Sequence, residues 1–176
     1  MIHLGRLIHL LNEHYLNHYK TILVGGFDEP FYKASQGSDL AEIRFTQDYI
    51  RSALHELAHW CVAGSERRKT DDFGYWYAKD GRNQQQQNEF YKVEIKPQAI
   101  EWALSLICGV KFEASIDNLQ QQVTGAELFE QQLRQQLKQY CSNGFNKKTR
   151  ALIQTLANHR RIKNPINFIQ SCLSKA

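Results

Sequence analysis

The spacing of apolar residues along the chain predicts helices mixed with short strands. Residues 3–19 place apolar side chains near a helical repeat, which predicts an amphipathic helix. Residues 21–27, TILVGGF, form a short apolar run, and residues 41–46, AEIRFT, alternate apolar and polar positions; both patterns are typical of strands. Helical spacing returns from about residue 48 to 62, and Gly64 follows as a stop signal.

The middle of the chain is predicted to contain a long loop and a further strand. Residues 70–88 are rich in turn-forming residues. Residues 90–95, FYKVEI, alternate in the manner of a strand, and Pro97 suits the first turn of the helix that follows.

The last third of the chain is predicted to be helical. Thr124 and Glu127 have the spacing of a capping box for a helix that ends near Tyr140, and Asn164-Pro165 starts a final short helix. Helices and strands do not alternate in a regular βαβ rhythm. We therefore expect an α+β fold, a small mixed sheet packed with several helices, in one domain spanning residues 1–176.

Composition indicates a soluble globular protein. Apolar residues make up 42% and charged residues 23% of the chain. No apolar run reaches the ~18 residues of a membrane span, and the amphipathic N-terminus lacks the features of a signal peptide. We expect a cytoplasmic protein without a membrane partner. Its four cysteines include no CxxC pair, which argues against a zinc ribbon and favours buried thiols.

Positive charge is concentrated at the C-terminal end. Residues 131–176 contain nine Lys or Arg and no Asp or Glu, whereas residues 1–130 contain 13 basic and 18 acidic side chains. A basic helical region from about residue 131 could attract an acidic partner, or it could be a solvated surface with no dedicated role. Both interpretations stay open, and nucleic acid is the less expected partner.

A metal-binding motif lies in the predicted helix at residues 48–62. His55, Glu56 and His59 form HExxH within SALHELAHWCVAG. Residues four apart project from the same helix face, so the two imidazoles can bind one ion. Glu56 is rotated by about 100° and can handle a proton beside the metal.

The third ligand is expected to be a carboxylate. Glu94 lies between Val93 and Ile95, and a charge in apolar surroundings needs a compensating partner, which a divalent cation supplies. Glu101 is expected either to face solvent or to orient a ligating histidine. Two histidines and one carboxylate occur both in non-haem iron oxygenases and in zinc proteases, so the residues alone leave the metal open.

The chain resembles a known family. The strings DEPFY, HELAHWCVAG, DFGYWYAKDGR, VEIKPQAIEW and DNL, in this order between about residues 22 and 119, are similar to elongation factor P hydroxylase. The region after about residue 119 does not extend this resemblance.

The resemblance implies a bacterial enzyme that hydroxylates the β-lysyl-lysine side chain of elongation factor P. It also implies Fe(II) held by His55, His59 and Glu94, with O₂ as co-substrate. The implied fold is similar to zincin-like, ribosome-maturation ribonucleases. Glu56 would then act as the catalytic acid or base.

A cationic substrate arm calls for carboxylates and aromatic faces. The candidate substrate-binding residues are Asp71, Asp72, Tyr75, Trp76, Tyr77 and Asp80. The same aromatic residues could instead pack in the core. Three other classes of function compete: a zinc metallopeptidase, a metal-dependent ribonuclease, and a binding module with a structural metal.

Overall fold

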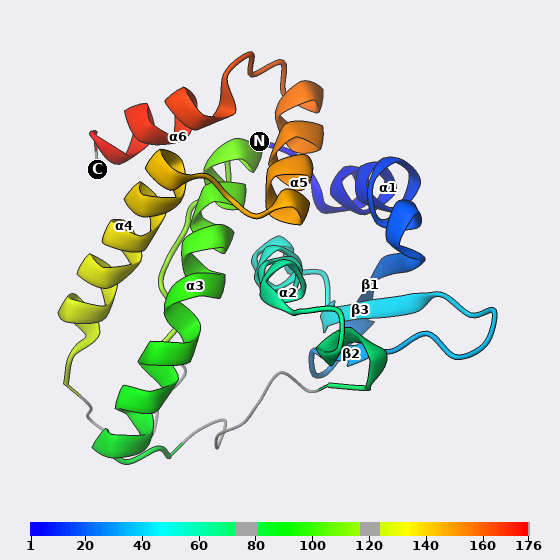
Figure 1. Ribbon diagram of the computed structural model, residues 1–176, viewed down its shortest axis with the longest axis horizontal. Helices are drawn as coiled ribbons and strands as arrows, with labels where there is room; N and C mark the ends of the chain where they lie inside the picture. Colours follow the sequence, from blue (N-terminus) through cyan, green and yellow to red (C-terminus); the bar gives the residue numbers. More distant parts are fainter. Residues whose placement is uncertain (73–80, 117–123, 176) are drawn as a thin grey trace.

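The computed structural model describes residues 1–72, 81–116 and 124–175 (Figure 1). In chain order the elements are α1 Leu4–His14, η1 Leu16–Tyr19, β1 Thr21–Phe27, β2 Phe31–Lys33, β3 Ala41–Thr46, α2 Ile50–Val62, η2 Arg67–Lys69, α3 Gln84–Cys108, α4 Ala126–Asn143, α5 Lys147–His159 and α6 Pro165–Leu173. These residues form an α+β fold in which a small sheet packs against α1 and α2, and the later helices pack on the other side of α2.

The sheet is mixed, as the sequence predicts. Its strand order is β1-β3-β2, with β1 parallel and β2 antiparallel to β3. Every second residue of β3 is buried, which confirms the alternation in AEIRFT. An isolated bridge between Tyr32 and Asp72 ties the segment after η2 to the edge of β2.

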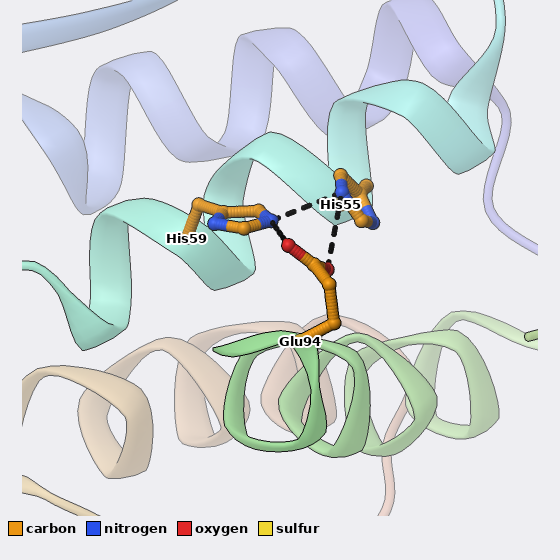
Figure 2. Close-up of side chains that lie close together, drawn as sticks. All are labelled: His55, His59 and Glu94. Atoms are coloured by element: carbon orange, nitrogen blue, oxygen red, sulfur yellow. Dashed lines mark hydrogen bonds and ion pairs between the residues drawn. The ribbon is translucent and has the colours of Figure 1, made fainter. Parts of the chain in front are cut away.

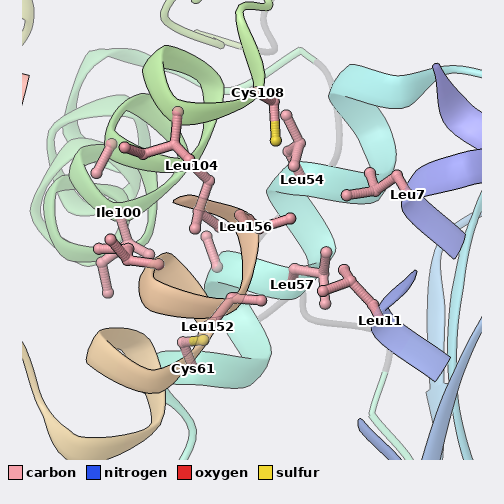
Figure 3. Packing of buried hydrophobic residues seen from close by; sticks show 14 of the residues in the cluster. Leu7, Leu11, Leu54, Leu57, Cys61, Ile100, Leu104, Cys108, Leu152 and Leu156 are labelled. Carbon is pink, nitrogen blue, oxygen red and sulfur yellow. The ribbon is translucent and has the colours of Figure 1, made fainter. Parts of the chain in front are cut away.

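Helix α2 lies between the sheet and α3 (Figure 1). Leu54, Leu57 and Cys61 of α2 are buried in a hydrophobic cluster that also includes residues from α1, α3 and α5 (Figure 3). Burying one leucine side chain contributes about 1.5–3 kcal/mol, so this packing fixes the rotation of α2 about its axis. The helix that carries the HExxH motif is therefore held on both sides.

Two sequence predictions around Pro97 are wrong. Residues 90–95 are not a strand, and Pro97 does not begin a helix, because both lie inside the 25-residue helix α3. Asn83 caps this helix in a capping box with Gln86, so the predicted loop ends before residue 84.

Packing explains how a proline fits inside α3. An interior proline costs about 3 kcal/mol because it lacks the backbone donor. Helix α3 contacts α2, α4, α5 and α6, and its buried apolar residues on several sides offset that cost. The same burial on several sides blurs the helical period in the sequence.

Residues 124–175, as the structure describes them, contain three helices, whereas the sequence pattern predicts two. Helix α4 begins at Ala126 after Gly125, which has a φ of 96° and no side-chain cap, so the predicted capping box of Thr124 and Glu127 is wrong. Asn164 caps α6 and Pro165 occupies its first turn, as predicted. Helix α5 was not predicted as a separate element. Among the described helices, none is both long and apolar enough to cross a membrane.

Candidate metal centre

Helix α2 presents both histidines of the motif to α3. His55 and His59 lie one turn apart, and their ring centroids are 4.6 Å apart. Each side chain is 22% exposed, so the rings stand at the border of the core. The apolar neighbours of these histidines point into the hydrophobic cluster, which leaves the two imidazoles facing the same space.

The carboxylate of Glu94 enters this space from α3 (Figure 2). Its Oε1 lies 3.4 Å from Nε2 of His59, and its Oε2 lies 3.9 Å from Nε2 of His55. The two Nε2 atoms are 3.0 Å apart. Only 2% of the Glu94 side chain is exposed, so burial brings a charged group against two rings that can bind metal.

Two of these three distances, 3.0 and 3.4 Å, match the spacing of donors around one ion. With metal–ligand bonds of about 2.1 Å, two donors at a right angle lie about 3.0 Å apart, and two at a tetrahedral angle lie about 3.4 Å apart. In the described part of the chain, His55, His59 and Glu94 form a group whose ligand atoms all lie within 4.8 Å of one another. The three residues that the sequence predicts as ligands are therefore brought together.

Glu101 supports the site from behind His55. Its side chain is 5% exposed, so it does not face solvent. Its Oε2 lies 2.8 Å from Nδ1 of His55. When Nδ1 of His55 carries the proton and its N–H donates a hydrogen bond to Glu101, the lone pair of Nε2 points toward Glu94 and His59. This is the tautomer that metal binding requires.

Gln98 holds the carboxylate of Glu94 in place. Its Nε2 donates to Oε2 of Glu94 at 3.2 Å and to the carbonyl of Ser115 at 2.8 Å. The backbone N–H of Ser115 donates back to Oε1 of Gln98 at 2.9 Å. Sequence reasoning missed Gln98. The signal was the spacing of Glu94, Gln98 and Glu101 at i, i+4 and i+7, which identifies a polar face of a helix.

Carboxylates around His55 favour its protonated form in the metal-free protein. Burial lowers the pKa of His55, but Glu101, then Glu94 and Glu56, raise it to about 10. A metal ion must displace the proton on Nε2. Burial also raises the pKa of Glu56; the two histidines lower it and the neighbouring carboxylates raise it again. Glu56 is thus a group that can hold or release a proton beside the centre.

Replacing Glu101 by glutamine is expected to weaken metal binding by about 10–100-fold, because the charged acceptor of the His55 ring is exchanged for a weaker, neutral amide oxygen. The variant also removes a carboxylate that raises the pKa of His55. Metal affinity of the native protein should therefore rise with pH up to about pH 10, and this dependence should be flatter in the variant. Metal titration across a pH series measures both effects. Equal affinity and an equal pH profile in the two proteins would show that Glu101 does not act through His55.

A pocket opens beside the metal centre, on the side of α2 that faces the sheet. Glu56, His59 and Trp60 line it from α2, Tyr32 from β2, and Asp72 from the segment after η2. Glu56 is placed at this pocket and is not part of the group that could bind metal.

The structure places only two of the six candidate substrate residues. Asp71 accepts a hydrogen bond from the backbone N–H of Ala34 at 2.8 Å. Asp72 forms an ion pair with Arg67 and lines the pocket. The remaining candidates lie outside the described residues: Tyr75, Trp76, Tyr77 and Asp80.

Most of the chain is similar to known proteins. The family described as elongation factor P hydroxylase matches residues 10–168. An elongation factor P lysine hydroxylase of Haemophilus influenzae is 41% identical over 163 residues, which cover 92% of each chain. The match continues well beyond residue 119, so α4, α5 and the start of α6 lie within the matched region. The chain belongs to the elongation factor P hydroxylase family.

Proposed function

We propose that this protein hydroxylates a lysine side chain of elongation factor P, with Fe(II) bound by His55, His59 and Glu94 and O₂ as co-substrate. The observation that carries the proposal is the convergence of two imidazoles and one buried carboxylate, in a member of this family. The name of the Haemophilus relative supports the choice of substrate and reaction.

The residues present fit iron. Two histidines and one carboxylate on one side of an ion leave positions for other ligands, and this donor set is that of non-haem Fe(II) oxygenases. Bound iron would supply the redox chemistry needed to oxidise an unactivated C–H bond, which acid–base groups alone do not provide. The proposed similarity of the fold to zincin-like proteins rests on the HExxH motif, which lies on helix α2.

Each surrounding residue then has a role. Glu101 holds the ring of His55 in the tautomer that leaves Nε2 free, and Gln98 orients the carboxylate of Glu94. Glu56 holds or moves a proton at its carboxyl oxygen, at the border between the centre and the pocket. Trp60, which is 4% exposed, helps to exclude water from this border.

The substrate is proposed to be the β-lysylated lysine of elongation factor P. Of the described candidates, Asp72 is the better placed to contact a cationic arm, because it lines the pocket whereas Asp71 is hydrogen-bonded to Ala34. Tyr75, Trp76, Tyr77 and Asp80 complete the proposed substrate-binding set.

Mass spectrometry of the substrate tests this function. Iron-loaded protein, incubated with β-lysylated elongation factor P under isotopically labelled O₂, is expected to add one labelled oxygen atom to the modified lysine. A chelator should prevent the gain, and elongation factor P without β-lysine serves as the matched control. No gain with protein that has retained its iron would contradict the proposal. Chelator-sensitive cleavage of casein or RNA in place of hydroxylation would support a hydrolase instead.

A further inference from the structure

Part of the wall of the pocket beside the metal centre is formed by Arg68, a residue that has no role in the proposed reaction. This cavity of about 40 Å³ lies between α2, the strands β2 and β3, and η2, and Arg68 of η2 lines it together with His59 and Trp60. It has room for about three water molecules or for one small functional group. Its position along His59 makes it a place for a ligand next to the metal.

Two polar groups in this wall lack an acceptor among the described residues. Nη1 of Arg68 and Nε1 of Trp60 are both buried and have no hydrogen-bond partner in the part of the chain that the structure describes. A buried donor without a partner costs about 1–3 kcal/mol, so such atoms need an explanation such as a missing ligand. Both residues line the same pocket.

The carboxylates of the pocket do not supply the missing acceptor. Asp72 pairs with Arg67, whereas Arg68 forms no ion pair with any residue in the described ranges. The position of Arg68 is fixed by the hydroxyl of Tyr32, which donates to its carbonyl at 3.1 Å, and by the Trp60 ring, 5.4 Å from the guanidinium carbon. The guanidinium is thus held in place and keeps its positive charge available.

A second cation strengthens the positive field at this wall. Nζ of Lys148 lies 4.6 Å from the centre of the Trp60 ring and donates to the carbonyls of Trp60 and Ala63. Burial first, and Arg68 second, lower the pKa of Lys148 to about 8. Two cations therefore lie against the Trp60 ring, and they favour an anionic group at the part of the lining formed by Arg68 and Trp60, whereas Asp72, proposed to contact the cationic arm, lines another part of the same pocket.

We propose that the pocket binds a small organic carboxylate, one oxygen of which accepts a hydrogen bond from Nη1 of Arg68. Carboxylate oxygens are acceptors only, and their hydrogen bonds to guanidinium groups are among the strong ones in proteins. The inference deepens the proposed function, on which it rests, by naming the class of a second ligand that lies beside the metal and next to the substrate.

Two probes of equal length and opposite charge test the inference: succinate and 1,4-diaminobutane. The indole N–H signal of Trp60 in ¹⁵N-labelled protein, assigned with a Trp60→Phe variant, reports binding. Succinate is expected to shift this signal in a saturable manner, and 1,4-diaminobutane should leave it unchanged. Arg68→Gln should weaken succinate binding at least about tenfold.

The control is Lys69→Gln, which removes the same charge from the same turn at an exposed side chain paired with Glu66. It should bind succinate as the native protein does. Arg68→Lys keeps the charge but loses the planar donors, and it should bind with intermediate affinity; this variant decides the matter if Arg68→Gln does not fold.

Three results would overturn the inference: no shift with succinate, a shift that persists in Arg68→Gln, or a shift with 1,4-diaminobutane instead. If the carboxylate belongs to a side chain of elongation factor P, free succinate will not bind and Arg68→Gln will weaken binding of that protein, which also overturns it. Because binding is measured without turnover, a failed hydroxylation assay with succinate binding intact would contradict only the proposed function.

Discussion

Replacing His55 by alanine is expected to abolish metal retention and to lower hydroxylation by at least about a thousandfold. His55 is proposed to supply one of the three donor atoms, and its Nε2 lies 3.0 Å from that of His59. Loss of a group that merely orients a ligand already costs 10–100-fold in affinity, so loss of the ligand itself should cost more. Metal content after gel filtration and turnover of β-lysylated elongation factor P measure the two effects.

His18→Ala is the matched control for this variant. His14 and His18 are also four residues apart, but both are exposed and neither belongs to the group that could bind metal. The control should keep native metal content and activity. Full metal content in His55→Ala would remove this residue from the ligand set.

Replacing Glu94 by glutamine is expected to remove the stabilisation that metal gives to the fold. A ligand at one hundred times its Kd stabilises a protein by about 2.7 kcal/mol, which for a chain of this size shifts Tm by roughly 5–10 °C. The amide keeps the shape of the side chain but offers a weaker, neutral donor, so the shift should be nearly absent. Thermal unfolding with and without added Fe(II), under anaerobic conditions, measures it.

Glu89→Gln provides the comparison on the same helix. Glu89 is exposed and pairs with Lys92, so its loss should leave the metal-induced shift unchanged. Taking the difference with and without metal separates the ligand role of Glu94 from any effect of the substitution on the metal-free fold. An unaltered shift in Glu94→Gln would mean that this carboxylate does not bind the ion.

The three residues that could bind a metal were predicted from the sequence to lie together, although part of the fold could not be predicted. The pairing of His55 and His59 could be predicted because residues one helical turn apart lie on the same face, and the amphipathic pattern of α2 predicts the helix. Glu94 follows from its apolar neighbours, since a charge among them needs compensation in a strand or in a helix. Glu94 could therefore be chosen as a candidate ligand even though residues 90–95 were wrongly predicted to be a strand.

The supporting residues depend on long-range packing that no local pattern contains. Helix α3 is buried on several sides, so the repeat that relates Glu94, Gln98 and Glu101 is hidden among apolar positions. The partner of Gln98 is the backbone of Ser115, 17 residues away. The pocket wall at Arg68 likewise forms because η2 packs against Trp60, and no sequence pattern predicts this contact.

Anomalous diffraction at the iron edge, from crystals grown anaerobically with Fe(II), tests the central claim most directly. We expect one peak within bonding distance of Nε2 of His55, Nε2 of His59 and a carboxylate oxygen of Glu94. A peak at another place in the protein, or iron bound to the two histidines with Glu94 turned away, would contradict it.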